Sequence, residues 1–460
     1  MGGLLAAGLV GACGSADDPD GQAPTAGSSG TAGASAGGMP SIAGAGASAG
    51  GTSGSSSGAA AVAGGSSSAG ASGSNGAAGS APNGGSSSDA GGGGGTTNAG
   101  NSNGGSGGSS AGAGGAGGSG GTSGGGAGNG GAGGGNSASV DQCKPIGWAT
   151  RSGRTGGTVN VTGGGNAAPN VVKSFADLKA FASDSTARVI HIDGTLGAGW
   201  SGTSGDRLEI KSNKTIIGMR PGTQLKAAIH IKDASNVILR NIVVRGPGSN
   251  EDQAWDNINI EGSSKNIWVD HAEFWDGQDG NADVVKGADN VTFTWSIFGY
   301  SIKGSHNLSN LIASSDDEPE SEGKLNVTFM FNWWKAASQR QPRCRYGQIH
   351  VVNNLYTEDT AVGQSQLGVS NGFKCNVLTE NNHFIDQTEP IDLGKQAGEG
   401  SVQQVTGNLF EGCSGNQKSD GKAFTPPYEY KPFLLPAAQV KAAVQKYAGA
   451  TLASPTACAK

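Results

Sequence analysis

Short segments rich in β-branched and aromatic residues recur between residues 213 and 410. Successive segments start about 22 to 36 residues apart, at Asn213, Asn236, Asn266, Asn290, Asn326, Gln348, Asn376 and Gln403. A repeat of this length is typical of a solenoid, because one unit cannot bury its apolar face alone and stacks on its neighbours. Strand-like units without helices between them favour a β-helix over a helical array. The repeat therefore predicts an all-β fold, a parallel β-helix.

Many of these segments contain a second asparagine a few residues after the first. The positions are Asn241, Asn332, Asn353, Asn354, Asn381, Asn382 and Asn408. Asparagine tolerates a left-handed backbone, and its side-chain amide can hydrogen-bond a nearby turn. We therefore expect a bend at these positions, with the amides bonded to the backbone of the next coil.

Helical patterns occur near the two ends of the domain. Ser174 offers an N-cap to a segment that ends at Phe181, with apolar side chains three residues apart. Residues 436–447 begin with Pro436 and alternate apolar residues with Lys and Gln. We expect these short helices to cap the stack, because the ends of a solenoid would otherwise expose apolar rungs.

The N-terminal part of the chain has a different composition. Residues 14–140 consist almost wholly of Gly, Ser, Ala, Thr and Asn, with no aromatic residue and no Lys or Arg. Such a segment has too little apolar surface to offset the entropy of ordering, so we expect a disordered linker followed by a folded domain at 141–460. All 30 basic residues and about 32 of the 36 acids lie in that domain. Its near-neutral charge argues against a nucleic-acid partner.

Residues 1–13 form a short apolar run that ends at Cys13. The run is too short to span a bilayer. It resembles the end of a bacterial lipoprotein signal, whose cysteine is lipidated after cleavage, although the usual preceding basic residues are missing. We expect an extracellular or cell-surface protein with a lipid anchor at Cys13. The alternative is the remnant of an ordinary signal peptide with a wrongly assigned start.

Five cysteines remain in the domain, an odd number in a setting where disulfides persist: Cys143, Cys344, Cys375, Cys413 and Cys458. Cys375 is expected to pair with Cys413 if their segments stack as neighbours, and Cys143 with Cys458 at the domain ends. Cys344 is expected to be a buried thiol, because no histidine motif beside it supports nucleophilic chemistry.

Three arginines lie within six residues, at Arg340, Arg343 and Arg345, just before an apolar strand segment. Arginine stays protonated, and its planar set of donors matches a carboxylate or a phosphate. Pro342 excludes the interior of a helix here. The cluster therefore predicts a site that binds an anion.

From about Pro145 to its end, the chain resembles the pectate lyases of polysaccharide lyase family 1. The resemblance rests on ordered motifs: Asn266-Ile-Trp-Val-Asp-His271, Asp279-Gly-Asn-Ala-Asp283, Asn290-Val-Thr-Phe-Thr-Trp295, Lys303, and Arg340-Gln-Pro-Arg-Cys-Arg345 followed by Gly347-Gln-Ile-His350. Each motif alone is modest, but their order and spacing together are specific. The resemblance implies a right-handed parallel β-helix. It also implies calcium-dependent β-elimination of de-esterified polygalacturonate, which gives 4,5-unsaturated oligogalacturonides.

The resemblance places the calcium ligands at Asp256, Asp279 and Asp283. Calcium takes about six to eight oxygen ligands, so carboxylates from adjoining coils would leave positions for water and a substrate carboxylate. The family often has an Asp two residues before Asp256, where this chain has Ala254. Either Asp252 reaches the site instead, or calcium binds weakly until substrate supplies oxygens.

The resemblance also assigns the catalytic roles. Arg340 is expected to take the C5 proton of the sugar, and Lys303 and Arg345 to bind the substrate carboxylate and stabilise the developing charge. An isolated arginine stays protonated, so this role requires a crowded positive site that opposes its charge, and it predicts an alkaline activity optimum. Alternatively, Arg340 stays charged and a water or hydroxide acts as the base.

Other functions compete with this reading. A polygalacturonase would need paired carboxylates as acid and base. A pectin lyase acting on the methylated polymer would have little use for calcium carboxylates, and a non-catalytic pectin-binding surface module is favoured only if Ala254 disables the metal site. Asp270, His271 and His350 are expected to be structural, and the acidic run 316–322 to be a solvated loop. We expect a monomer.

Overall fold

The computed structural model describes residues 143–200, 207–249, 255–304, 306–394 and 400–458, and the structural statements below concern these ranges. The predicted signal remnant at 1–13, with Cys13, and the predicted linker at 14–140 lie outside them. Asp252 and Ala254 lie outside them as well.

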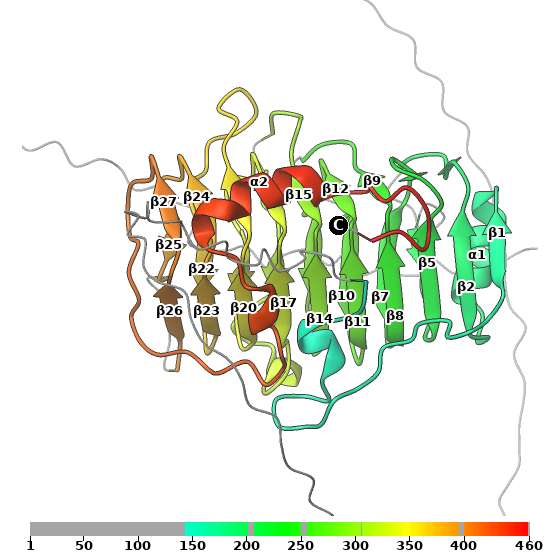
Figure 1. The fold of residues 1–460 in the computed structure, drawn as a ribbon, viewed down its shortest axis with the longest axis horizontal. Coiled ribbons are helices and arrows are strands. Elements are labelled where there is room, and N and C mark those ends of the chain that lie inside the picture. The colour runs from blue at the N-terminus through cyan, green and yellow to red at the C-terminus, as the bar shows by residue number, and fades with distance from the viewer. Residues whose placement is uncertain (1–142, 201–206, 250–254, 305, 395–399, 459–460) are drawn as a thin grey trace, which may run out of the picture. The chain divides into compact units, whose positions relative to one another are not determined.

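Within the described ranges, the strands form three sheets that run side by side along one stack (Figure 1). The first sheet contains β1 (Pro169–Val172), β2 (Arg188–Ile192), β5 (Lys214–Gly218), β8 (Ser235–Arg240), β11 (Lys265–Asp270), β14 (Asp289–Thr294), β17 (Val327–Met330), β20 (Gln348–Val352), β23 (Asn376–Glu380) and β26 (Val402–Thr406). The second sheet contains β4 (Arg207–Glu209), β7 (Ala228–Lys232), β10 (Ile258–Glu261), β13 (Ala282–Val284), β16 (Leu311–Ile312), β19 (Arg343–Cys344), β22 (Val369–Asn371) and β25 (Ile391–Asp392). The third sheet contains β3 (Thr195–Leu196), β6 (Gln224–Leu225), β9 (Val243–Arg245), β12 (Glu273–Trp275), β15 (Ile297–Gly299), β18 (Trp333–Lys335), β21 (Leu355–Thr357), β24 (His383–Ile385) and β27 (Leu409–Glu411).

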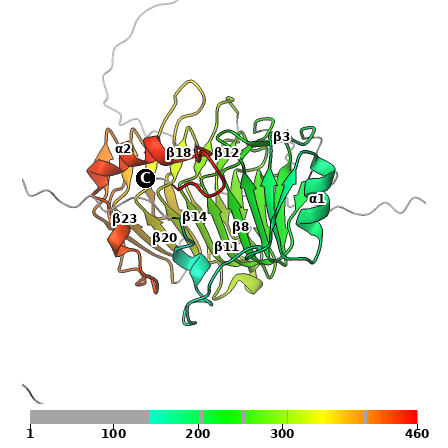
Figure 2. The same cartoon turned by 45° about the vertical axis from the view of Figure 1, so that its right-hand side comes forward.

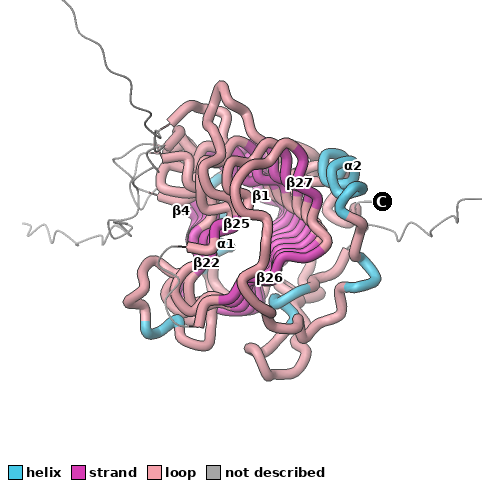
Figure 3. Tube along the Cα trace, turned by 90° about the vertical axis from the view of Figure 1, so that its left-hand side faces the viewer, coloured by secondary structure: helices cyan, strands magenta, loops and turns pink. Residues whose placement is uncertain are grey.

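The strand pairing is parallel throughout these sheets. In the first sheet β8 pairs with β11 and β11 with β14, so each strand contacts the equivalent strand of the next coil. Figure 3 looks along the stack, where the strands of successive coils lie behind one another. One coil therefore supplies one strand to each sheet, which confirms the predicted parallel β-helix.

From β5 onward, the repeat seen in the sequence covers strands of two of the three sheets. The segment that starts at Asn236, for example, forms β8 in the first sheet, turns at Asn241 and continues as β9 in the third sheet. The second sheet was not predicted. Most of its strands are only two to four residues long, which is too short for a clear sequence pattern.

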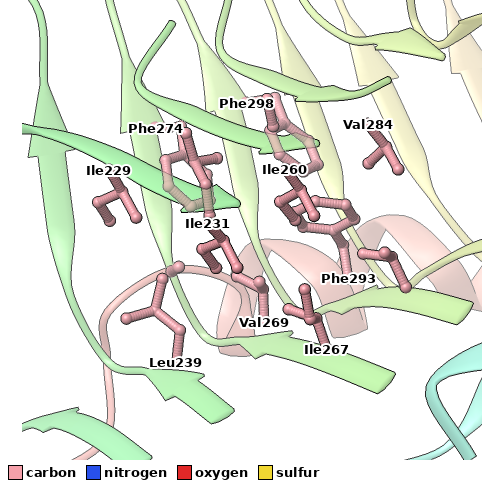
Figure 4. Close-up of a cluster of buried hydrophobic side chains, with 14 of the residues drawn as sticks. Ile229, Ile231, Leu239, Ile260, Ile267, Val269, Phe274, Val284, Phe293 and Phe298 are labelled. Carbon is pink, nitrogen blue, oxygen red and sulfur yellow. The ribbon is translucent and has the colours of Figure 1, made fainter. Parts of the chain in front are cut away.

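Apolar side chains fill the interior of the coils. In β13, Ala282 and Val284 are fully buried in the core, and Asp283 between them points to the opposite face of the sheet. The same alternation in the other strands makes one continuous core, part of which Figure 4 shows. Its aromatic members stack along the axis, as Phe274 does on Phe298 with ring centroids 5.8 Å apart. Burial of this surface, at about 25 cal/mol per Å², is the main term that holds the coils together.

An asparagine ladder lines the corner between the first and third sheets. The Nδ2 of Asn332 donates to Asn354 Oδ1 (3.1 Å), Asn354 donates to Asn382 (3.0 Å), and Asn382 donates to Asn408 (2.9 Å). Each of the first three also donates to a backbone carbonyl of a neighbouring coil, as Asn354 does to Phe329 (2.9 Å). The predicted stacking of these amides is confirmed.

Other predicted bend residues serve a different contact. Asn353 and Asn381 have left-handed backbones (φ 53° and 52°), and both side chains donate to the carbonyl of Leu435, at 2.7 and 2.9 Å. Asn241 (φ 55°) likewise donates to the carbonyl of Leu452 at 3.0 Å. These three corners therefore hold the C-terminal segment against the outside of the stack.

The N-terminal helix α1 (Phe175–Ser183) covers the first coils, as predicted (Figure 2). Ser174 is its N-cap, with its Oγ accepting a hydrogen bond from the Asp177 N–H at 3.1 Å. Leu178 and Ala182 face the core. Three short 3₁₀ helices, at Gly147–Thr150, Pro319–Ser321 and Lys431–Phe433, are also present in the described part of the chain.

The C-terminal helix α2 (Ala437–Tyr447) does not lie over the end of the stack, contrary to the expectation for a cap. It packs along the flank, near β21 and β24, and buries Val440 and Val444 (Figure 1). The reason is an apolar cluster on the outside of the corner, where Trp295 and Phe331 are fully buried beneath this segment. Neither helix, nor any other in the described ranges, is long and apolar enough to cross a membrane.

Two disulfides join parts of the domain. Cys143 pairs with Cys458 (Cα atoms 5.4 Å apart), as predicted. The expected Cys375–Cys413 pair is wrong, because Cys375 pairs with Cys344 (Cα atoms 6.0 Å apart) and Cys413 is a free thiol. Cys344 was expected to be unpaired. It ends β19 and faces the core, where Cys375 of the following coil approaches it.

Candidate active site

A row of residues that are polar except for Leu311 lies along the outer face of the second sheet. Because the strands pair in register, residues at equivalent positions of successive strands lie next to each other. The row runs through Glu209, His230, Asn259, Asp283, Leu311, Arg343, Ser370 and Asp392. The unpredicted sheet therefore carries two residues of the motifs, Asp283 and Arg343.

The three predicted calcium ligands lie close together beside this row. Asp256, Asp279 and Asp283 are 7, 8 and 7 % exposed. Burial first, and the negative charge of Asp279 second, raise the pKa of Asp283 to about 7. Burial, followed by the charges of Asp283 and Asp279, raises the pKa of Asp256 well above its usual value. The site thus holds more negative charge than its own surroundings stabilise.

Two carboxylate oxygens in this group lack a hydrogen-bond donor. They are Asp256 Oδ1 and Asp279 Oδ1, and both are buried. A Cβ on Gly280 would lie 2.8 Å from Asp256 Oδ1 and 3.3 Å from Asp283 Oδ1, so oxygens from two coils border the same small space. Hard carboxylate oxygens without donors are the ligands that calcium prefers.

The described side chains do not form a complete metal cage. No group of three or more His, Cys, Asp or Glu side chains in the described ranges is arranged to hold a metal ion. A calcium ion takes about six to eight oxygens, many of which can be water or substrate. The three aspartates therefore fit an open calcium site in their donor chemistry and their excess charge.

Arg340 lies within electrostatic reach of the carboxylates. It is 6 % exposed, and its charge partly offsets the rise in pKa that burial and the neighbouring carboxylates cause in Asp256 and Asp283. No hydrogen bond or ion pair to another described residue holds its side chain. Its backbone is left-handed (φ 59°), and its carbonyl accepts a hydrogen bond from the N–H of Asn310 at 2.7 Å. A buried guanidinium without a fixed partner is available to a ligand.

The two predicted substrate-binding residues, Lys303 and Arg345, have different surroundings. Lys303 is exposed on the loop that follows β15, and no described residue pairs with its side chain. The loop itself is anchored by Asp276, whose Oδ1 accepts the N–H of Ile302 at 3.0 Å. Arg345 is 7 % exposed, and its Nε donates to Asp316 Oδ1 at 2.7 Å. Lys303 is therefore exposed to solvent, whereas Arg345 is paired with Asp316 within the protein.

Three residues of this site were missed by sequence reasoning. The buried Tyr300 donates from its hydroxyl to the Leu308 carbonyl at 2.7 Å, and burial together with the charge of Asp256 raises its pKa. His306 Nε2 lies 3.4 Å from Asp279 Oδ1. Asn259 Nδ2 donates to Asp256 Oδ2 at 3.1 Å. Only Asn259 carried a signal, since it follows Asp256 by three residues and pairs in register with Asp283.

Two histidines outside the site are structural, as expected. His271 and Asp270 are fully buried, and Asp270 Oδ2 accepts from Arg240 Nε and His271 Nδ1, both at 2.8 Å. His350 is fully buried between Tyr428 and Glu380.

The comparisons with known proteins agree with this architecture. The family model described as pectate lyase matches residues 135–452. Pectate lyase E of Dickeya chrysanthemi is 31 % identical over 350 residues, which cover 64 % of this chain and 83 % of that protein. The pectate trisaccharide-lyase of Bacillus licheniformis is 30 % identical over 317 residues, covering 66 % of this chain and 84 % of that protein.

Solved structures share the fold. A pectate lyase from Bacillus sp. N165, solved in complex with trigalacturonate, superposes with a TM-score of 0.52 at 23 % identity, over 66 % of this chain and 98 % of that one. A pectate lyase bound to a hexasaccharide gives a TM-score of 0.53 at 22 % identity, over 66 % and 96 % of the two chains. Because the family model spans more than half of the sequence, this chain belongs to the pectate lyase family and is a polysaccharide lyase.

Proposed function

We propose that this protein cleaves α-1,4-linked polygalacturonate by calcium-dependent β-elimination. The observation that supports the proposal best is the group of three buried aspartates beside Arg340, since their unpaired oxygens and raised pKa values suit a divalent cation and a polyanionic ligand. Relatives support the substrate class, because one is named a pectate trisaccharide-lyase and another was solved with trigalacturonate.

The reaction removes the proton at C5 of a galacturonate and breaks the bond between C4 and the glycosidic oxygen. The electron pair of the C5–H bond forms the C4–C5 double bond, and the glycosidic oxygen leaves with a proton from solvent. Asp256, Asp279 and Asp283 would hold calcium, which would bind the substrate carboxylate and stabilise the charge that develops beside C5. The products are oligogalacturonides with a 4,5-unsaturated end.

The cationic side chains have separate roles in this proposal. Arg340 takes the C5 proton, while Lys303 and Arg345 bind uronate carboxylates and stabilise the developing anion. Calcium and the neighbouring cations disfavour the charged form of Arg340, so activity rises at alkaline pH. If Arg340 stays charged, it stabilises the anion while hydroxide takes the proton, and alkaline activity results again.

The proposal is tested by following the ultraviolet absorbance of the new double bond on polygalacturonate, with and without a chelator. We expect the absorbance to increase with time when calcium is present, and this increase to stop when chelator is added. Polymer cleavage without new absorbance would indicate a hydrolase, and chelator-insensitive activity that is best on methylated pectin would indicate a pectin lyase. Binding without cleavage would indicate a non-catalytic module.

We further propose export, with a lipid on Cys13 that anchors a monomeric enzyme to the cell surface. The apolar run that ends at Cys13 supports this proposal. Metabolic labelling with a fatty acid should mark the full chain and not its Cys13→Ser variant.

A further inference from the structure

A small pocket lies next to the aspartates, toward the N-terminal coils. It has a volume of about 20 Å³ and is lined by Arg207, Ala228, Ile229, His230, Trp255, Asp256, Asn259 and Asp279. Two of these residues, Asp256 and Asp279, belong to the proposed calcium set. The pocket is therefore continuous with the site, but its other walls come from β4, β7, Asn259 of β10 and Trp255, the residue that precedes Asp256.

Arg207 and Trp255 form a fixed pair in the wall of this pocket. The Arg207 guanidinium carbon lies 4.2 Å from the centroid of the Trp255 ring. Its Nε donates to Glu209 Oε1 at 2.8 Å, and the side chain is 20 % exposed. A guanidinium held by stacking and by one hydrogen bond is already oriented, so its two terminal nitrogens can bind a carboxylate with little loss of entropy.

Trp255 also has an unused donor. Its Nε1 is buried and has no hydrogen-bond partner within the described part of the chain. An orphan N–H costs free energy unless a ligand or water satisfies it. A sugar hydroxyl is a suitable acceptor for it.

The position of this pair along the stack separates it from the reacting sugar. Arg207 lies on β4, five strands before β19, which follows Arg340 directly along the chain. With about 4.8 Å between neighbouring strands, the two backbones are roughly 24 Å apart. Arg207 and Arg340 therefore come from coils on opposite sides of Asp256 and Asp283 along the stack.

We propose that Arg207, oriented by Trp255 and Glu209, binds the carboxylate of a second galacturonate in the same chain and makes the enzyme select de-esterified polymer there. This inference rests on the proposed function. The ligand is an anionic sugar and not a second cation, because the guanidinium would repel a cation. A methyl ester at this sugar removes the charge that Arg207 binds, so esterification is disfavoured away from the scissile bond as well as at it.

The test compares Arg207→Gln with the wild type on polygalacturonate and on partly methylated pectin. A hydrogen bond between charged groups corresponds to about a tenfold change in affinity or more. For Arg207→Gln we expect KM on polygalacturonate to rise about tenfold, with kcat within twofold of the wild type. The rise in KM should be smaller on the partly methylated pectin. Arg220→Gln is the matched control, because Arg220 is also an arginine paired with an acid, Asp193, outside the pocket.

Trp255 is tested as a positioning residue. Trp255→Phe keeps an aromatic ring beneath Arg207 and should retain most of the selectivity, whereas Trp255→Ala should lose it as Arg207→Gln does. If Trp255→Ala raises KM equally on both polymers, the tryptophan is only structural and its proposed role is overturned.

A binding measurement separates this inference from the proposed function. The affinity for tetragalacturonate is measured by calorimetry in an Arg340→Lys background, with and without Arg207→Gln. Weaker binding in the double variant supports the subsite even if the wild type proves inactive. Unchanged binding and unchanged KM, in a wild type that binds and cleaves, overturn the subsite alone. A wild type that neither binds nor cleaves overturns both proposals.

Discussion

Arg345 donates from Nε to Asp316 Oδ1 at 2.7 Å, and its Nη1 donates to the Ala313 carbonyl at 3.2 Å. The acidic run that contains Asp316 was expected to be a solvated loop, but this residue holds one of the predicted substrate-binding arginines. Glu318 in the same run is buried and accepts the backbone N–H of Lys286 at 2.6 Å. The loop is therefore part of the scaffold that supports the arginine motif.

This pair leads to a prediction about substrate affinity. Arg345→Gln should raise KM on polygalacturonate about tenfold or more, because the charged hydrogen bond that we propose between Arg345 and a uronate would be lost. Asp316→Asn should raise KM by less than about fivefold, since Asp316 is 46 % exposed and such an ion pair contributes at most about 1 kcal/mol. Steady-state kinetics on polygalacturonate check both variants. A lower KM in Asp316→Asn would mean that Asp316 competes with substrate for Arg345.

Arg340→Lys should lower kcat on polygalacturonate by about 100-fold or more, which is the usual effect of losing a positioned proton acceptor. A lysine ammonium cannot reproduce the planar donor set of arginine. Arg343→Lys is the matched control in the same motif and should stay near the wild-type rate. A full rate in Arg340→Lys, with an unchanged unfolding temperature, would remove Arg340 from the mechanism.

The sequence predicted most strands of the first and third sheets from β5 onward, for a physical reason, whereas β1, β2 and β3 precede the repeat. The strands of these two sheets together form long apolar segments, and corner asparagines such as Asn354 and Asn382 recur in register. The second sheet was not predicted because most of its strands are only two to four residues long, so that an alternation such as Ala282, Asp283 and Val284 is too short to identify a strand. The sheet that holds the site was thus the hardest to see.

The motifs located the charged groups of the site but not their neighbours. His306 lies beside Asp279, and Tyr300 lies within electrostatic reach of Asp256, in positions that no local sequence pattern encodes. Cys143–Cys458 was predicted correctly, but the Cys344–Cys375 pair was missed because these two cysteines are one coil apart, and the length of that coil depends on the loops between β20, β21 and β22. The sequence pattern determines which residues pair between stacked strands, but it does not determine the contacts that loops make.

Removing the Cys344–Cys375 disulfide should destabilise the domain. The bond closes a loop with a sequence separation of 31, for which the loss is about 3 to 4 kcal/mol. The double variant Cys344→Ala with Cys375→Ala should unfold roughly 5 °C or more below the wild type in calorimetry. Cys413→Ser, which removes the free thiol, is the control and should change the unfolding temperature little. Equal unfolding temperatures for all three proteins would argue that the bond does not form.

The stability of the calcium-free protein should fall as pH rises toward and through about 7. The folded pKa of Asp283 is raised to about 7, above its ordinary value of about 3.9 in an unfolded chain. The folded state therefore binds more protons between these values, and the stabilisation present at low pH is lost as pH rises. Unfolding temperatures in chelator between pH 5 and 8 check this, and Asp283→Asn should flatten the dependence. Added calcium should restore stability at pH 8 in the wild type only.

Gly280 should be essential for the proposed calcium site, because the residue has no room for a side chain. A methyl group there would lie 2.8 Å from Asp256 Oδ1, and 3.3 Å from both Asp283 Oδ1 and the Ser309 carbonyl. The 2.8 Å contact is too short for a real Cβ atom, so the Asp256 carboxylate must move away from the Asp283 carboxylate. Gly280→Ala should therefore weaken calcium binding about tenfold or more in calorimetry, whereas a purely structural defect would instead lower the unfolding temperature in chelator. Gly157→Ala, where a Cβ meets nothing within 4 Å, is the matched control and should bind calcium as the wild type does. Wild-type calcium affinity in Gly280→Ala would show that the ion, if it binds, is not held between Asp256 and Asp283.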